Sequence, residues 1–125
     1  MIPRYNRAKP VIIMTQTLSE SDIFVLLQKE RRRLTLTILA ETATGLSAIE
    51  LAKRVASEEF QDPSPHDVRN VYISLQHEHL PMLAEAEVVE YHIIEGVVRP
   101  GLTFDAPAEF LADVSDADLP WSDVM

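Results

Sequence analysis

The chain has 125 residues, which is room for one domain, and it contains no cysteine and only three glycines. Without cysteine there is no disulfide, no thiolate metal site and no cysteine nucleophile. The glycines never lie close enough together to form a phosphate-binding loop, which excludes a P-loop NTPase and a dinucleotide-binding fold. The 46% of hydrophobic and 25% of charged residues are typical of an ordinary soluble domain.

The net charge of −9 is unevenly distributed along the chain. Residues 1–18 contain three bases and no acid, whereas residues 101–125 contain six acids and no base. An acid-rich surface with few lysines is expected of a protein kept soluble in concentrated salt, and also of an acidic mesophilic protein. No early apolar run is long enough for a signal peptide or a membrane span, so we expect a cytoplasmic protein.

The N-terminal part of the chain predicts an arm followed by a helix. Residues 1–17 carry two prolines and few helix signals, which indicates a mobile basic arm. We expect Ser19 to be the N-cap of a first helix. An acid stands three positions later, and apolar residues stand just before the cap and four positions after it. The five consecutive apolar residues from Ile23 to Leu27 form a stripe that must be covered on more than one side. Either the domain's own core or a partner subunit provides that cover.

Three further helices are expected. Lys29–Arg33 separates the first helix from a second, which ends at Thr44–Gly45 because glycine adopts the left-handed conformation that closes helices. A capping box at Ser47–Glu50 opens a third helix. Ser64–Asp67, with serine at the N-cap and proline after it, opens a fourth helix that Pro81 should stop or kink.

A β-hairpin is expected after the fourth helix. Residues 88–94 are rich in β-branched and aromatic side chains, Glu95-Gly96 is a two-residue turn, and residues 97–99 begin a return strand. Three helices followed by a two-stranded sheet are the layout of a winged helix-turn-helix.

We therefore expect a mainly α fold with a β-hairpin: a winged helix-turn-helix domain over residues 18–102, with an extra N-terminal helix. Residues 103–125 form an acidic C-terminal tail, in which residues 106–114 are a candidate for a short amphipathic helix.

Several motifs also match a known family. They are Glu30-Arg31-Arg32-Arg33, Ser47-x-x-Glu50-Leu51-Ala52, Val71-Tyr72-x-x-Leu75-x-x-x-His79-Leu80-Pro81 and Val88-Val89-Glu90-Tyr91. With them, residues 18–100 resemble a winged-helix family found mainly in halophilic archaea, whose members are described as uncharacterised or as relatives of ArsR-type regulators. The resemblance implies a winged-helix fold and a regulatory role in a salt-loving cell, without a ligand or target. One departure bears on the turn from helix to strand, because Glu87 stands where the family often has glycine.

In a winged helix that binds DNA, the last helix enters the major groove, so we expect helix 65–80 to read bases and the hairpin 88–100 to contact the backbone. The positions of this helix that its buried stripe leaves exposed are Arg69, Asn70, Ile73, Ser74, Gln76 and His77. Arg69 and Asn70 are the best base readers, because arginine can bind O6 and N7 of guanine and asparagine can pair with adenine. The alternative for Arg69 is an ordinary solubilising role.

Four arginines are candidate phosphate contacts: Arg31, Arg32, Arg33 and Arg99. The alternative for the first three is pairing with Glu30, Glu41 and nearby acids.

The acids Glu58, Glu59, Asp62 and Asp67 argue against DNA binding, because they precede the reading helix where phosphates would approach. In concentrated salt this repulsion is largely screened, and the attraction of phosphates to basic residues weakens with it.

The sequence gives no support for metal binding or catalysis. The four histidines are the only metal candidates, and His77 and His79 lie two positions apart, so they point in different directions on a helix. His79, close to Pro81, is expected to be a packed structural residue. No recognisable nucleophile or acid–base arrangement is present, so we expect no metal, no cofactor and no enzymatic activity.

A homodimer is expected. Phe110 and Leu111 of the tail should dock on the first helix, within the chain or across the dimer. The candidate dimer-interface residues are Ile23, Phe24, Leu27, Phe110 and Leu111.

Two functions remain open at this point. The first is a dimeric transcriptional regulator that binds double-stranded DNA. The second is a winged-helix protein–protein interaction module that uses its acidic face and C-terminal tail. A basic or neutral face around the arginines favours the first, and acids covering that face favour the second.

Overall fold

The computed structural model of the chain describes residues 18–113, and the expected arm at 1–17 and the tail residues 114–125 lie outside the described residues. The helices are α2 (Glu20–Leu26), α3 (Glu30–Ala40), α4 (Ala48–Glu59), α5 (Pro65–Ser74), α6 (Leu80–Glu85) and α7 (Asp105–Asp113), with a π-helical turn η1 (Leu75–His79) between α5 and α6. The strands are β1 (Leu46–Ser47), β2 (Val89–His92) and β3 (Val97–Pro100). A mainly helical fold with a β-hairpin is therefore confirmed. Within residues 18–113, each helix is too short or too polar to cross a membrane.

The serines predicted to begin helices do so. Ser19 and Ser64 each exchange two hydrogen bonds with the aspartate three positions later. The Ser47 hydroxyl accepts the N–H of Glu50 at 3.1 Å. These bonds satisfy donors that the first turn of a helix leaves free, which is why the positions could be recognised locally. The boundary at Lys29–Arg33 is different: Lys29 is the N-cap of α3, so the arginine run is the first turn of a helix and not a separator.

The hairpin strands belong to a three-stranded antiparallel sheet in the order β1-β3-β2. Val98 of β3 pairs with Leu46 on one side and with Tyr91 on the other. β1 is only two residues long, too short to show the alternation by which a strand is recognised in a sequence.

Gly45 is required by this sheet and not by the end of a helix. α3 ends at Ala40, so the expectation that Thr44–Gly45 ends it is wrong. Gly45 has a φ of +95°, and a Cβ atom there would lie 2.6 Å from both the Cγ atom of Arg99 and the carbonyl oxygen of Val98. Glycine therefore lets the chain pass close to β3 as it enters β1.

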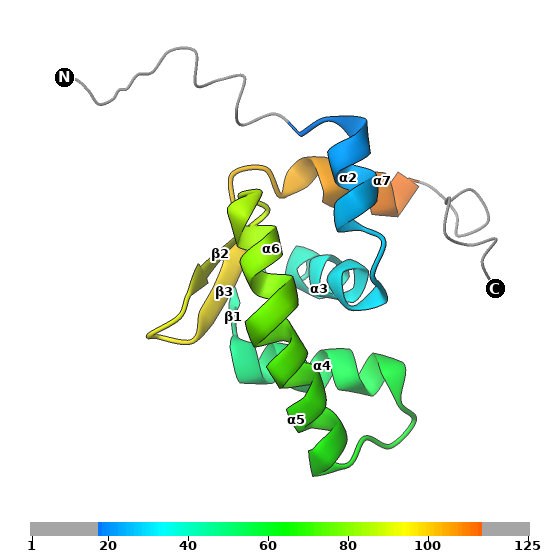
Figure 1. Cartoon of the computed structure of the whole chain (residues 1–125), viewed down its shortest axis with the longest axis vertical. Helices are drawn as coiled ribbons and strands as arrows, with labels where there is room; N and C mark the ends of the chain where they lie inside the picture. The colour runs from blue at the N-terminus through cyan, green and yellow to red at the C-terminus, as the bar shows by residue number, and fades with distance from the viewer. Residues whose placement is uncertain (1–17, 114–125) are drawn as a thin grey trace.

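The long helix passes Pro81 without ending. α5, η1 and α6 follow one another and form one continuous helix in front of the other elements (Figure 1). Proline has no N–H and its ring collides with the carbonyl one turn earlier in a regular α-helix. The π-helical turn η1 ends at His79, two residues before Pro81, and a wider turn of this kind relieves that collision.

The core lies between this long helix, α3, α4 and the sheet. Its completely buried leucines are Leu27, Leu36, Leu39, Leu51, Leu75, Leu80 and Leu83. α2 and α7 lie together at one end of the molecule and α4 lies towards the other end (Figure 1). The ring of Phe110 on α7 packs edge-on against Phe24 on α2, with centroids 5.3 Å apart. α2, the extra N-terminal helix, and α7 therefore cover each other's apolar side chains within one chain.

The hairpin turn has four residues, Ile93–Gly96, so the expected two-residue turn is wrong. Pairing ends at His92 and Val97, and the N–H of Gly96 donates to the carbonyl of His92 at 2.7 Å. Isoleucine is typical of strands, which is why the sequence pattern extends the strand too far. Ile93 and Ile94 are instead 69% and 96% exposed in the turn.

Glu87 closes α6 in a conformation that normally belongs to glycine. Its φ is +63°, and it is the one non-glycine residue with a positive φ among residues 18–113. The N–H of Val88 donates to the carbonyl of Leu83, and the N–H of Glu87 donates to the carbonyl of Ala84. This pattern is the glycine-favouring closure of a helix C-terminus. The side chain of Glu87 is exposed.

Glu87→Gly should therefore stabilise the protein. Relief of the left-handed strain of about 1–2 kcal/mol exceeds the added backbone entropy of glycine, leaving a gain of about 0.5–1 kcal/mol. Urea unfolding monitored by circular dichroism measures the change. Glu87→Ala is the matched control, because it removes the same carboxylate but keeps the Cβ atom, and it should leave stability nearly unchanged. Equal stability of the glycine and alanine variants would contradict the assignment.

Candidate functional site

The exposed side of α5 carries most of the predicted base-reading residues. Arg69, Asn70 and His77 are exposed, and Ile73 is 39% exposed. Ser74 and Gln76 are half-buried. The Nδ2 atom of Asn70 donates to Nε2 of His66 at 3.1 Å, so these two polar side chains adjoin on the same exposed surface. The surface is polar, with Ile73 as its exposed apolar residue, and the acids Asp67 and Glu78 lie on the same long helix as Arg69.

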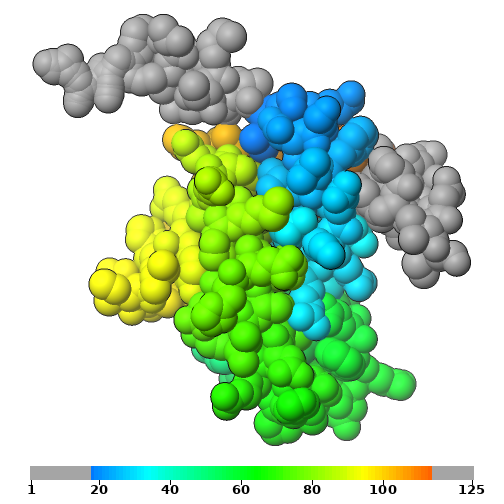
Figure 2. All heavy atoms as spheres, viewed as in Figure 1, coloured from blue at the N-terminus to red at the C-terminus, as the bar shows by residue number. Residues whose placement is uncertain are grey.

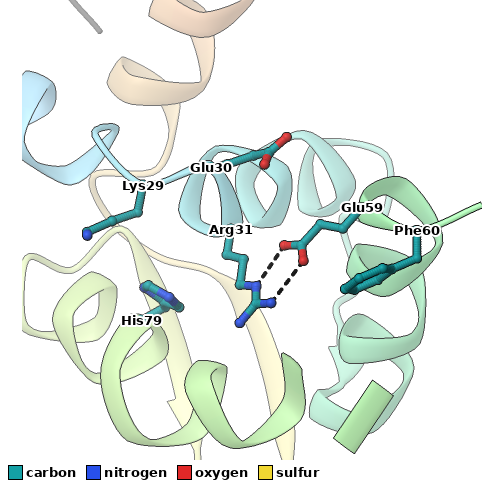
Figure 3. Close-up of a pocket in the computed structure, with 6 residues that line it drawn as sticks. All are labelled: Lys29, Glu30, Arg31, Glu59, Phe60 and His79. Carbon is teal, nitrogen blue, oxygen red and sulfur yellow. Dashed lines mark hydrogen bonds and ion pairs between the residues drawn. The ribbon is translucent and has the colours of Figure 1, made fainter. Parts of the chain in front are cut away.

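Arg31 joins α3 to α4 and α5. Its guanidinium donates to both carboxylate oxygens of Glu59, at 2.7 and 2.9 Å, and to the hydroxyl of Ser74 at 2.8 Å. The hydrogen bond to Glu59 raises the pKa of Arg31. Figure 3 shows the guanidinium between the Glu59 carboxylate and His79. The two-pronged bond to Glu59 fixes the distance and orientation of the guanidinium, and its remaining donor then holds Ser74 of α5.

Arg32 is buried, so we no longer expect it to contact phosphates. Its side chain is 3% exposed, and the guanidinium donates to the carbonyls of Leu26 at 2.6 Å and Val25 at 3.3 Å. These carbonyls lie at the C-terminal end of α2, where a positive charge is favoured. Burial lowers the pKa of Arg32. A third donor contacts Nδ1 of His79 at 3.4 Å.

Arg33 is half-buried and donates to the carbonyl of Leu27 at 2.6 Å. Arg31 is thus paired with an acid of the chain, as the alternative expected, but the acid is Glu59, and neither Glu30 nor Glu41. Sequence patterns could not identify this pair, because 28 positions separate its members and no local spacing relates them.

His79 is 5% exposed and lies in η1. Arginine can only donate, so Nδ1 of His79 is the acceptor and the imidazole is neutral. Burial lowers the pKa of His79, and the positive charges of Arg32, Arg31 and Lys29 add to this effect, while Glu78 opposes it. The residue therefore ties the long helix to the first turn of α3.

A hollow of about 380 Å³ lies beside this network. It is lined by Lys29, Glu30, Arg31, Glu59, Phe60 and His79 (Figure 3). The ion pair between Arg31 and Glu59 spans it. The carboxylates of Glu30 and Glu59 balance the charges of Lys29 and Arg31, and His79 is neutral, so the lining carries little net charge for an ionic ligand. Within residues 18–113 no group of three or more metal-ligating side chains comes together.

Two of the four acids expected to repel DNA are engaged within the protein. Glu59 is paired with Arg31, and Asp67 exchanges hydrogen bonds with the N-cap Ser64. Glu58 and Asp62 are exposed before α5.

On the hairpin, Arg99 is exposed and pairs in register with Glu90. Nε2 of His92 lies 3.4 Å from the carboxylate of Glu90. On the side of the hairpin that carries Arg99, Glu90 therefore lies between Arg99 and His92.

Several candidate dimer-interface residues contribute to the chain's own packing. Leu27 is completely buried and Ile23 is 8% exposed, both in the core. Phe24 and Phe110 contact each other, and Leu111 packs against the core while half-buried. Among the large apolar side chains of α2, the exposed one is Val25, at 46% exposure.

The comparisons with known proteins identify a family for most of this fold. The model described as "Domain of unknown function (DUF7344)" matches residues 24–99, which is more than half of the chain. A search of curated proteins and a search of solved structures each find no match.

The ion pair between Arg31 and Glu59 should contribute more to stability than an exposed one. Arg31→Gln leaves the Glu59 carboxylate, 12% exposed, without its charged partner, and should lower the free energy of unfolding by about 1–2 kcal/mol. Arg54→Gln is the matched control, because Arg54 pairs with Glu50 while both side chains are 44% exposed, and it should cost about 0.5 kcal/mol or less. Urea unfolding of both variants measures the difference. Similar losses would show that the Arg31 network does not stabilise the fold.

The neutral state of His79 predicts a pH dependence. The unfolded chain protonates this histidine near its ordinary pKa of about 6.5, whereas the folded chain protonates it only at lower pH. Its contribution to stability is thus fully present above about pH 6.5 and is lost as pH falls through the lower folded pKa. His79→Asn keeps an acceptor near the position of Nδ1 and does not titrate, so its stability should fall less on acidification. Unfolding series at several pH values test this, and parallel pH curves for the two proteins would refute it.

Proposed function

The chain belongs to the DUF7344 family, a family of domains of unknown function, and we propose that this member is a winged helix-turn-helix transcriptional regulator that binds double-stranded DNA. In this proposal α5 enters the major groove and the β2–β3 hairpin is the wing.

The order of elements supports the winged-helix assignment. α3, β1, α4 and α5 are followed by β2 and β3, and β1 pairs with the far strand of the hairpin. In the proposal α4 and α5 are the helix–turn–helix pair, and the hairpin of β2 and β3 follows α6. The link between α4 and α5, Phe60–Ser64, is slightly longer than the usual ~3–4 residues of such a turn.

The observation that carries the proposal is the free outer surface of α5. Val71 and Leu75 hold the helix in the core, while Arg69 and Asn70 remain exposed on it. Arginine and asparagine are side chains that discriminate guanine and adenine by paired hydrogen bonds. Ile73 adds an apolar surface of the kind that contacts the thymine methyl group.

The charge around this helix is compatible with DNA when salt is high. Glu59 is paired with Arg31, which leaves Glu58, Asp62, the capping Asp67 and the exposed Glu78 as the carboxylates near this helix. At molar salt the screening length is about 3 Å, so these carboxylates repel phosphates only at contact. Arg99 on the hairpin and a partly exposed Arg31 remain as phosphate contacts in the proposal.

A homodimer completes the proposal, since regulators with one reading helix per subunit commonly bind two half-sites. Ile23 and Leu27 are held in the core, so such a contact would have to use exposed residues such as Val25. The second candidate function is a protein–protein interaction module. It is favoured by the exposed acids Glu58 and Asp62 next to α5.

Selection of bound duplexes from a random DNA pool in molar potassium chloride tests the function. We expect enrichment of a defined sequence, because base contacts and apolar contacts persist when phosphate attraction is screened. Arg69→Ala and Asn70→Ala should each weaken binding to the enriched duplex by roughly tenfold or more. Arg54→Ala on α4 is the matched control and should bind as the wild type does. No enrichment, or equal binding by all variants, would reject the regulator and favour the interaction module.

A further inference from the structure

Among residues 18–113, the outer edge of β2 has no strand beside it. The sheet order is β1-β3-β2, so β2 pairs with β3 on one side only. In the view of Figure 2 the hairpin projects from the body of the molecule as the yellow lobe. An edge strand of this kind presents its main-chain N–H and C=O groups to any strand that comes beside it.

The hydrogen bonds of the hairpin fix which residues direct their main-chain groups towards this open edge. The carbonyls of Val88 and His92 accept N–H groups from the residues that flank β3. Because successive residues of a strand alternate between its two edges, Val89 and Tyr91 direct their N–H and C=O groups outward. The pairing of Val89 with Pro100, which has no N–H to exchange, agrees with this direction.

The most exposed large apolar side chains of residues 18–113 lie near the two ends of this edge. Ile94 is 96% exposed and Ile93 is 69% exposed, both in the turn that follows β2. Leu102, 72% exposed, lies near the other end, because the residues on either side of it donate to the carbonyls of Val88 and Glu87. Apolar side chains gathered in this way mark a surface that a partner covers.

We infer that β2 is an interface with a second copy of the chain, whose β2 pairs with it antiparallel about a twofold axis and continues the sheet from one copy into the other. Antiparallel pairing brings the turn of one copy, with Ile93 and Ile94, towards the end of the edge that carries Leu102 in the other. A twofold axis repeats the contact, as in most homodimers. The inference rests on the proposed function only for its homodimer, and it does not depend on DNA.

Main-chain direction and charge select one register for this pairing. Outward-facing residues lie opposite outward-facing residues, so within β2 Tyr91 lies opposite either Val89 or Tyr91 of the second copy. The first register sets the two Glu90 carboxylates directly against each other, which is destabilising. The second register sets Glu90 opposite His92 twice, once in each half of the pair. A second copy therefore complements the charges of this edge in the second register.

The hairpin already uses the same charge pattern within one copy. Nε2 of His92 lies 3.4 Å from the carboxylate of Glu90, and Glu90 pairs in register with Arg99 of β3. In the dimer, His92 of the second copy would flank Glu90 on its open side. Directly opposite residues that do not exchange main-chain hydrogen bonds have the closest side chains in an antiparallel pair, so this contact is short.

The dimer should be weak. A standard protein interface buries about 800 Å² on each partner, more than one short strand edge and three apolar side chains supply. The carboxylates of Glu87 and Glu95 lie near the two ends of the paired strands and repel each other across the interface. We expect a dissociation constant of roughly 10 µM or more.

Sedimentation equilibrium of the full chain, from micromolar to millimolar concentration, tests the interface. The wild type should dimerise reversibly. His92→Glu sets a carboxylate against Glu90 of the second copy twice, so it should raise the dissociation constant by about tenfold. His92→Lys should lower it by about threefold or more, because it places a full positive charge there. His66→Glu makes the same charge change on α5 and is the matched control, which should dimerise as the wild type does.

Cysteine substitutions test the register, because the chain has no cysteine of its own. A mixture of the Glu90→Cys chain and the His92→Cys chain should form a disulfide-linked pair on oxidation. Directly opposite residues of this kind have Cα atoms about 4.5 Å apart, within the range of a disulfide. Each chain oxidised alone should cross-link less. Circular dichroism of every variant verifies the fold.

Three results would overturn the inference. The first is a monomer at every concentration; if hydrogen exchange then shows the Tyr91 amide to be protected, another segment such as residues 1–17 covers the edge instead. The second is a dimer that His92→Glu leaves unchanged. The third is a dimer that the Glu90→Cys chain cross-links best by itself, since this indicates the other register. All three measurements are made without DNA, so failure of the interface and failure of the regulator remain distinguishable.

Discussion

The position of the long helix, formed by α5, η1 and α6, against the rest of the chain depends on the guanidinium groups of Arg31 and Arg32. One residue apart on the first turn of α3, they reach different partners: Arg31 bonds Glu59 of α4 and Ser74 of α5, and Arg32 bonds the end of α2 and His79 of η1. Four elements are thereby fixed to the start of a fifth. Because Val71 of α5 and Leu75 of η1 are buried in the core, this network and the core together leave Arg69 and Asn70 turned outward. The same network explains why two arginines in a strongly acidic protein are not simply surface charges.

The two arginines act through different physics. Arg31 is partly exposed and its charge is matched by a carboxylate, so the pair stabilises chiefly by geometry and charge together. Arg32 is buried, and within residues 18–113 no carboxylate forms an ion pair with it; main-chain carbonyls at a helix C-terminus accept its hydrogen bonds, and the nearby charge of Glu78 favours its charged form. A neutral His79 is the acceptor that such a buried donor requires, since a second positive charge at 3.4 Å would be repelled.

Local signals made much of this fold predictable from sequence. Ser19, Ser47 and Ser64 begin helices because each hydroxyl bonds an N–H within three residues. Features that depend on distant partners could not be predicted. Gly45 looked like a helix end, but its role is set by β3, more than 50 positions later. The run of isoleucines looked like strand because residue type, and not pairing, was all that the sequence offered. The burial of Arg32 depends on where α2 ends and where η1 passes, and neither is encoded in the run of arginines itself.

The candidate site was partly predictable for the same reason. Exposure of Arg69 and Asn70 follows from helical periodicity, whereas the partners of Ser74 and Glu59 follow from tertiary packing. The central claim is that the outer surface of α5 binds a DNA duplex. Amide chemical shifts of the nitrogen-15-labelled chain, titrated with the selected duplex in molar potassium chloride, measure this residue by residue. The account predicts changes concentrated between Arg69 and His77 and at Arg99 of the hairpin. Changes confined to Glu58–Asp62 and α7, with α5 unaffected, would contradict it.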